Sequence, residues 1–145
     1  MNNPKSYTEY GKLLHKLLSE IINANDFEQI IEKYQKAALI NEEEAKEIRQ
    51  IFAKMMQNPQ VKEWFNSEYE VLTEPAILLP EGETFRPDRI IKHKDETLVI
   101  DFKTGESEAK HKKQVLNYMQ IMQQLNFPAV KGYLLYLPEV KVEQV

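Results

Sequence analysis

In roughly the first half of the chain, apolar side chains recur at intervals of three and four residues. This spacing places them on one face of a helix, as in the Leu14, Leu17 and Leu18 stripe. Asp26, Asn41 and Asn58 are residue types that favour helix N-termini, and Pro59 suits a first helical turn. The pattern predicts helices over 10–22, from 26 through 34, from 41 through 55, and from 58 to 65.

From about Ser67 the pattern changes to short runs rich in β-branched and aromatic residues, separated by turn-forming residues. The first three runs are expected to pair as an antiparallel meander. The order helices–βββ–α–β predicts an α/β fold with a mixed β-sheet flanked by helices. We expect one domain over 1–145, with a mainly helical part (1–66) and a βββαβ core (67–145). The predicted strands are 68–80, 84–93, 97–103, 130–137 and an edge strand at 140–145, with a helix over 108–125.

One predicted strand, residues 97–103, carries an acid and a lysine on the same face. Because side chains alternate along a strand, Asp101 and Lys103 lie opposite the apolar positions 98, 100 and 102. Hairpin pairing with the preceding strand would bring Asp88 beside Asp101. Two close carboxylates repel unless a cation or a proton lies between them, and their oxygens suit Mg²⁺ or Mn²⁺. The alternative is a salt-bridged surface hairpin without a bound ion.

Composition and charge narrow the classes of function. The 145 residues include no cysteine, which excludes disulfides, thiolate metal sites and a cysteine nucleophile. The net charge of −4 argues mildly against nucleic acid, but residues 1–79, with 9 basic and 13 acidic side chains, account for all of it. A metal on Asp88 and Asp101 would leave the surface of residues 80–115 positive. With no apolar run long enough to span a membrane, we expect a cytoplasmic protein without a membrane partner.

The order of several motifs resembles a known family. Pro87 and Asp88, followed by Asp101, Phe102 and Lys103, resemble the signature of PD-(D/E)XK nucleases. More narrowly, they resemble the nuclease domain of RecB/AddA-type bacterial helicase–nucleases, the exonuclease V class. The further matches, in the family's order, are Gly11-x-x-x-His15, Glu74-Pro75, Ile100 through Gly105, and Gln114-x-x-x-Tyr118.

The resemblance implies a restriction-endonuclease-like fold and a Mg²⁺- or Mn²⁺-dependent deoxyribonuclease that leaves 5′-phosphates. It implies Asp88, Asp101 and Lys103 as catalytic residues. The implied metal ligands are His15, Asp88, Asp101 and the backbone carbonyl of Phe102, with Glu74 as an additional candidate. The candidate DNA-contacting residues are Gln114, Tyr118, Lys110, Lys112 and Lys113.

Some of these residues have simpler interpretations. His15 borders a leucine stripe, where a histidine is more often a packing residue than a ligand. Gln114 and Tyr118 share a helix face that is equally explained as a solvated surface.

The surrounding protein is also implied by the resemblance. Nuclease domains of this type normally follow helicase domains, yet the chain has no G-x-x-x-x-G-K-[ST] phosphate loop. We therefore expect a fragment or terminal domain of a larger helicase–nuclease in recombinational DNA repair, or a stand-alone relative. DNA and helicase domains or subunits are the expected partners. Two alternatives are a catalytically inactive nuclease-fold module that binds DNA or a helicase, and a helical interaction domain with a coincidental hairpin.

Overall fold

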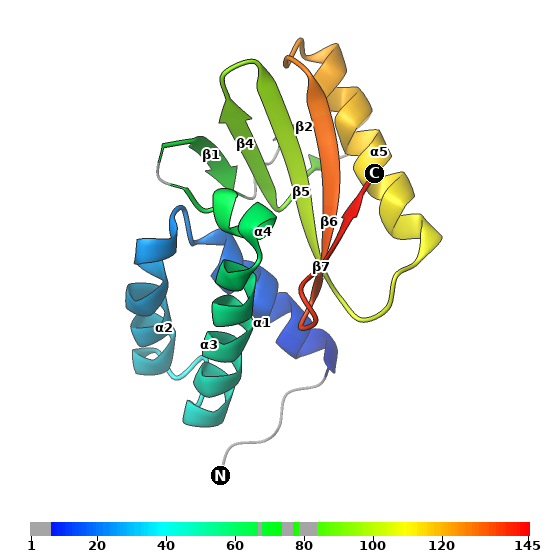
Figure 1. Cartoon of the computed structure of the whole chain (residues 1–145). Helices are drawn as coiled ribbons and strands as arrows, with labels where there is room; N and C mark the ends of the chain where they lie inside the picture. Colours follow the sequence, from blue (N-terminus) through cyan, green and yellow to red (C-terminus); the bar gives the residue numbers. More distant parts are fainter. Residues whose placement is uncertain (1–6, 67, 74–76, 79–83) are drawn as a thin grey trace. The chain divides into compact units, whose positions relative to one another are not determined.

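The computed structural model describes residues 7–66, 68–73, 77–78 and 84–145 (Figure 1). The chain divides after Phe65 into two compact units, residues 1–65 and residues 66–145. This division falls next to the predicted change from helices to strands at 66–67. Each unit is described by itself below.

The first unit consists of helices, two of which start at residues that cap them locally, whereas the expected cap Asp26 makes no side-chain cap hydrogen bond to its helix and instead accepts one from the Asn23 N–H. Asn41 accepts a hydrogen bond from the backbone N–H of Glu44, and the Glu44 carboxylate accepts one from the Asn41 N–H. Asn58 caps the last helix by accepting from the backbone N–H groups of Gln60 and Val61, with Pro59 at its first position. The predicted helices are confirmed, except that the first ends at Ser19 instead of residue 22. The elements are α1 (Tyr7–Ser19), the 3₁₀ turn η1 (Ala24–Asp26), α2 (Phe27–Lys36), α3 (Glu42–Gln57) and α4 (Pro59–Glu63).

Aromatic packing holds this helical unit together. The rings of Phe27 and Phe52 stack with their centroids 4.1 Å apart, and Phe65 meets Phe52 edge to face at 5.8 Å. Leu14 and Leu17 of the predicted stripe are fully buried. The apolar periodicity of the sequence therefore marks the core of this unit.

The second unit contains a mixed five-stranded sheet in the order β1-β4-β5-β6-β7. The pairs β1·β4 and β4·β5 are antiparallel, as the meander predicts; β6 runs parallel to β5, and β7 pairs with β6 at the edge. The elements are β1 (Glu70–Thr73), β2 (Ile77–Leu78), β3 (Thr84–Phe85), β4 (Arg89–His93), β5 (Glu96–Thr104), α5 (Ala109–Gln124), β6 (Val130–Leu137) and β7 (Lys141–Gln144).

Two of the predicted strands are each divided. The segment 68–80 contains β1 and β2, and the segment 84–93 contains β3 and β4, with β2 and β3 paired in a sheet of their own. Pro87 stands in the gap between β3 and β4, where its missing N–H cannot continue a ladder of hydrogen bonds. The break leaves Asp88 directly before β4 and outside regular pairing.

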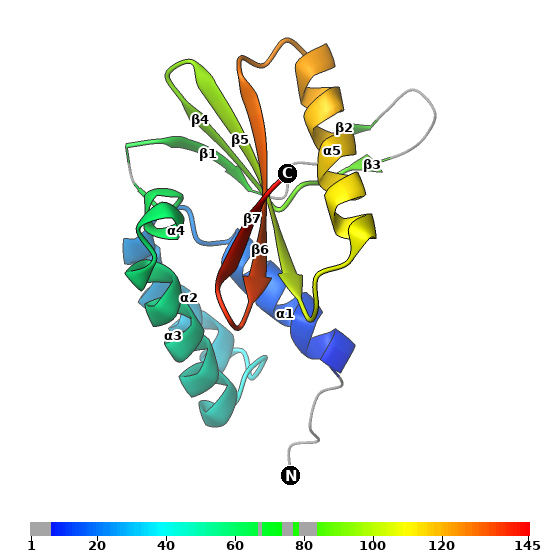
Figure 2. The same ribbon diagram turned by 45° about the vertical axis from the view of Figure 1, so that its right-hand side comes forward.

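Helix α5 packs closely on one face of this sheet, as Figure 2 shows. At Gly132 of β6, an added Cβ would lie 2.5 Å from the Met119 sulfur and 2.6 Å from a Val115 methyl, so only glycine allows this approach. Val99 of β5 belongs to a buried cluster with Met122 of the helix. Since side chains alternate along β5, the face covered by α5 is also the face of residues 101 and 103.

The predicted fold class is confirmed: the chain has a mixed sheet and flanking helices, consistent with a restriction-endonuclease-like α/β fold. A parallel β5–β6 pair needs a crossover, and α5 supplies it. Among the residues that the structure describes, no helix is both long enough and apolar enough to span a membrane.

Candidate active site

Two carboxylates come together where β4 begins and β5 nears its end. In the antiparallel register Arg89 pairs with Ile100, so Asp88 comes opposite Asp101. Both are buried, with exposed fractions of 8% and 4%. Asp88 Oδ2 also accepts a hydrogen bond of 2.7 Å from the backbone N–H of Phe102. That bond fixes one carboxylate of this acid pair, Asp88 and Asp101, to the strand that carries the other.

The pKa of Asp101 lies far above the ordinary value of an aspartate. Burial above all, and then the negative charge of Asp88, raise the pKa of Asp101 to about 7, although Lys103 opposes the rise. Lys103 Nζ lies 2.7 Å from Asp101 Oδ2, yet this ion pair does not outweigh burial and the second acid. The acid pair therefore favours a proton or an additional cation near neutral pH.

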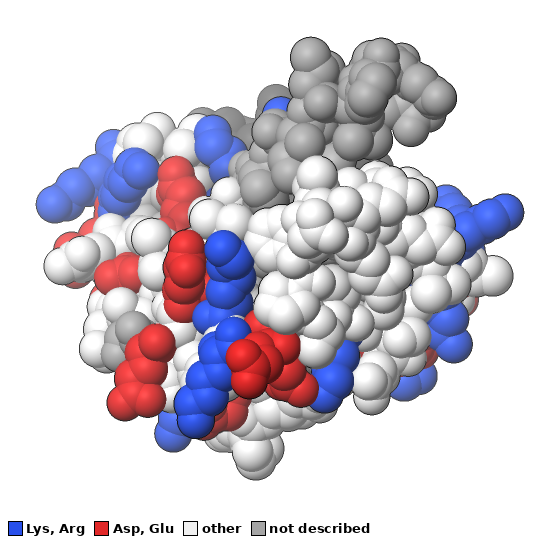
Figure 3. Space-filling model, turned by 90° about the horizontal axis from the view of Figure 1, so that it is seen from above, with Lys and Arg blue, Asp and Glu red and all other residues white. Residues whose placement is uncertain are grey.

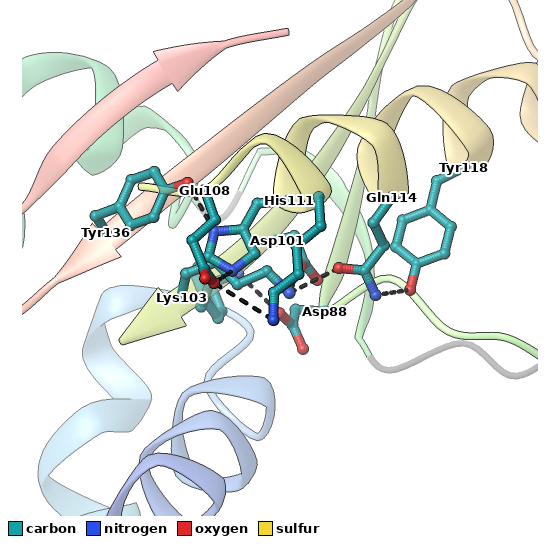
Figure 4. Close-up of polar contacts among 10 residues, drawn as sticks. Asp88, Asp101, Lys103, Glu108, His111, Gln114, Tyr118 and Tyr136 are labelled. Carbon is teal, nitrogen blue, oxygen red and sulfur yellow. Dashed lines mark hydrogen bonds and ion pairs between the residues drawn. The ribbon is translucent and has the colours of Figure 1, made fainter. Parts of the chain in front are cut away.

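Lys103 is held from its other side by α5 (Figure 4). Its ammonium donates a 2.7 Å hydrogen bond to Gln114 Oε1, and Gln114 Nε2 donates to the Tyr118 hydroxyl at 2.9 Å. Burial raises the pKa of Tyr118, and so does the negative charge of Asp101. The sequence-predicted residues Asp101, Lys103, Gln114 and Tyr118 thus form one connected polar row.

A second polar group lies at the start of α5 and was missed by sequence reasoning. His111 is buried, its Nδ1 lies 2.9 Å from the Tyr136 hydroxyl, and its Nε2 lies 3.1 Å from a Glu108 oxygen. A carboxylate only accepts, so the neutral ring donates from Nε2 and accepts from Tyr136 at Nδ1. Burial lowers the pKa of His111, and the charge of Lys103 lowers it further. The group therefore holds a neutral imidazole close to Lys103.

No local sequence signal pointed to this group. Tyr136 comes beside Lys103 because β5 and β6 pair in parallel, with Lys103 opposite Tyr136 in the register. Figure 4 shows Tyr136 and Tyr118 at opposite ends of the polar side chains drawn. Nothing in the sequence pattern linked His111 with either of its partners.

The remaining predicted residues have different outcomes. His15 lies partly buried on α1, in the first unit, and its role as a metal ligand stays a prediction. Glu74 lies outside the described residues. Lys110, Lys112 and Lys113 are exposed on α5. Within the described ranges, no group of three or more histidine and acidic side chains is arranged to hold a metal ion.

Comparison with known proteins supports the chemistry of this arrangement. The model of the PD-(D/E)XK nuclease superfamily matches residues 2–144. The chain belongs to the PD-(D/E)XK nuclease superfamily. Among curated proteins, the search finds no match. The resemblance noted from the sequence is thus confirmed at the level of the superfamily, while the RecB/AddA subfamily stays a prediction.

Superfamily membership gives the acid pair and Lys103 a chemical context. It suggests a hydrolase acting on nucleic acid, and nucleases of this superfamily generally use divalent metal ions. Asp88 follows a proline, and Asp101 and Lys103 are separated by one residue, as the superfamily's name describes. The structure brings these three side chains together, so the residues of the sequence signature are also neighbours in the folded protein.

Proposed function

We propose that the protein is a DNA nuclease that hydrolyses phosphodiester bonds with Mg²⁺ or Mn²⁺. The observation that carries this proposal is the buried acid pair with Lys103 beside it, in a chain of the nuclease superfamily. A binding-only module would have no need for two buried carboxylates that repel each other. Their presence favours catalysis over the inactive alternative.

The residues present fit a divalent metal ion. Burial and the charge of Asp88 raise the pKa of Asp101, so a cation would relieve a repulsion that Lys103 leaves in place. Mg²⁺ usually keeps several waters and binds through one or two carboxylates together with substrate phosphates, so a third protein acid is not required. Asp88 and Asp101 would hold it, with His15 and the Phe102 carbonyl as further predicted ligands. A metal bound there lowers the pKa of a water and neutralises charge on the scissile phosphate.

Lys103 would act on the reacting phosphate. An ammonium has three N–H donors, and one of them donates to Gln114, while the charge of Lys103 pairs with Asp101 at 2.7 Å. A remaining donor can bind a phosphate oxygen or orient the attacking water. Because Asp101 and Gln114 fix the ammonium before the substrate arrives, little reorganisation accompanies the development of charge in the transition state.

We further propose that this nuclease serves a DNA-end-processing helicase–nuclease of the RecB/AddA type, in recombinational repair. The support is the order of the sequence motifs, from Gly11 and His15 through Gln114 and Tyr118. In that setting helicase domains would deliver DNA strands to the acid pair. Exposed Lys110, Lys112 and Lys113 supply positive charge for phosphates at the start of α5.

The test is incubation of linear single-stranded and double-stranded DNA with the protein in Mg²⁺, Mn²⁺ or EDTA. We expect cleavage with either metal, products carrying 5′-phosphates, and none in EDTA. The Asp101→Asn variant, which keeps the shape of the side chain, serves as the matched control for a contaminating nuclease. Cleavage by this variant at the wild-type rate would contradict the proposal.

A further inference from the structure

A groove runs along the exposed side of α5, next to the residues already described. Its volume is about 550 Å³, within the range of ligand-binding clefts. Its described lining residues all belong to one side of a single helix, α5. From 110 to 120 this side extends about 15 Å. The α5 groove is lined by Lys110, Lys113, Gln114, Leu116, Asn117 and Gln120.

The α5 groove is continuous with the candidate active site through Gln114. The Oε1 atom of Gln114 accepts the hydrogen bond from Lys103, and the same residue lines the groove. Lys103 in turn forms the ion pair with Asp101. A chain of nucleotides whose scissile phosphate lies at Lys103 would therefore have the α5 groove beside it.

The chemistry of the groove changes along its length. Lys110 and Lys113 lie in the first turns of the helix, but residues 114–130 include no Asp, Glu, Lys or Arg. Figure 3 shows a broad area without charged side chains beside a region of mixed charge. The distal lining consists of a leucine that is 46% exposed, Leu116, and the amides of Asn117 and Gln120.

This change in chemistry favours a single strand over a duplex. A duplex presents phosphates along its whole surface and keeps its base faces stacked inside, so an uncharged surface with an exposed leucine gains little from it. A single strand presents unstacked bases, whose edges hydrogen-bond to amides and whose faces pack on apolar side chains. The two lysines suit phosphates, and the uncharged part of the groove suits bases.

We propose that the α5 groove binds one single strand of DNA beside the cleaved bond, an inference that rests on the proposed nuclease function. Phosphates lie at Lys110 and Lys113, and bases contact Leu116, Asn117 and Gln120. The α5 groove also distinguishes two neighbouring lysines that the sequence pattern does not distinguish. Both Lys112 and Lys113 are exposed, but only Lys113 lines the groove.

The experiment measures binding of a fluorescein-labelled oligothymidylate by anisotropy in EDTA, so that metal-dependent cleavage does not alter the probe. Asn117→Ala and Gln120→Ala should each weaken binding by about 2- to 10-fold, the loss of one hydrogen bond. Gln123→Ala is the matched control, because Gln123 is exposed on α5 outside the groove. A duplex of equal length should bind more weakly and respond to none of these variants.

Salt dependence tests the phosphate-binding end separately. Lys113→Ala should lower the slope of log affinity against log salt by about 0.7, and Lys112→Ala should lower it less. Two results would contradict single-strand binding in the α5 groove: wild-type affinity in the Asn117→Ala/Gln120→Ala double variant, or equal affinity for the duplex. Neither result would affect the nuclease proposal. If the protein binds DNA as expected but cuts none with any metal, the result would support single-strand binding in the α5 groove and contradict the nuclease proposal.

Discussion

Strand β5 has an acid–lysine ion pair at each end, and the two pairs have opposite electrostatics. At its first residue, Glu96 forms an ion pair with Lys131 of β6, and that contact lowers the pKa of Glu96. Near its other end Asp101 lies 2.7 Å from Lys103, yet the pKa of Asp101 is raised to about 7. A carboxylate paired with a lysine therefore favours the charged acid at one end and the neutral acid at the other.

The difference comes from burial and from a second acid. Glu96 and Lys131 are about half exposed, so water solvates both charges and the pair contributes little to stability. Asp101 is 4% exposed and faces Asp88, so one lysine does not compensate for lost hydration and repulsion. Chemistry is thus expected at the end where the protein leaves charge uncompensated.

The largest expected difference between the two ends concerns cleavage. Asp101→Asn should lower the rate by about 10³-fold or more, because it removes a ligand charge at the proposed metal position. Glu96→Gln, the matched change at the other end, should leave both cleavage and stability nearly unchanged, because water solvates this exposed pair. Single-turnover assays with Mn²⁺ and urea denaturation measure both. Equal cleavage rates for the two variants would contradict the assignment of catalysis to the Asp101 end of β5.

The pH dependence of stability should also distinguish the ends. Because the pKa of Asp101 is raised, the folded metal-free protein binds this proton more tightly than the unfolded chain does between about pH 4 and about pH 7. The contribution of Asp101 to the free energy of unfolding is full below that pH window. It is lost as the pH rises through the window, and the loss is at most about 4 kcal/mol. Glu96, whose pKa is lowered, has the opposite sign: its contribution is lost as pH falls.

Urea denaturation of the metal-free protein at pH 5 and pH 8 measures this effect. Wild type should be less stable at pH 8, and Asp101→Asn should remove most of the difference. If the stability of Asp101→Asn still differed between pH 5 and pH 8 as much as that of wild type, another group would be responsible.

Lys103→Ala tests whether the lysine at the buried end acts on the reaction. It should reduce the single-turnover rate at saturating DNA by about 10²- to 10³-fold, with little change in affinity. Lys131→Ala, at the exposed end, is the control and should change neither quantity. A normal single-turnover rate with poor binding would make Lys103 a docking residue without a catalytic role.

The smallest expected effect separates the two acids from each other. Both Asp88→Ala and Asp101→Asn should abolish cleavage, but only Asp88 accepts the buried Phe102 N–H. Its loss leaves that donor without its partner, so Asp88→Ala should be less stable than Asp101→Asn by about 1–3 kcal/mol. Thermal unfolding without metal measures the difference. Equal melting temperatures would mean that another acceptor replaces Asp88.

Much of the fold was readable from the sequence because its signals are local. The caps Asn41 and Asn58 act on N–H groups two or three residues away, and the helices they start are present. The antiparallel pairing of β4 with β5 follows from the short turn between them, which favours pairing of neighbouring strands. The break at Pro87 was missed because a run rich in β-branched and aromatic residues outweighed one residue that cannot donate a ladder hydrogen bond.

The sequence by itself placed three residues of the candidate site together, since alternation puts Asp101 and Lys103 on one face and the hairpin register puts Asp88 opposite Asp101. Only the tertiary structure decided their environment. Burial of the acid pair, the hydrogen bond from Lys103 to Gln114 and the position of Tyr136 beside Lys103 depend on the crossover of α5 and the parallel pairing of β6. These contacts join residues 11 to 33 positions apart in the chain, where no periodicity or spacing specifies which side chains meet. The pKa of Asp101 is a property of that environment, so it could not be read from the residue and its neighbours in sequence.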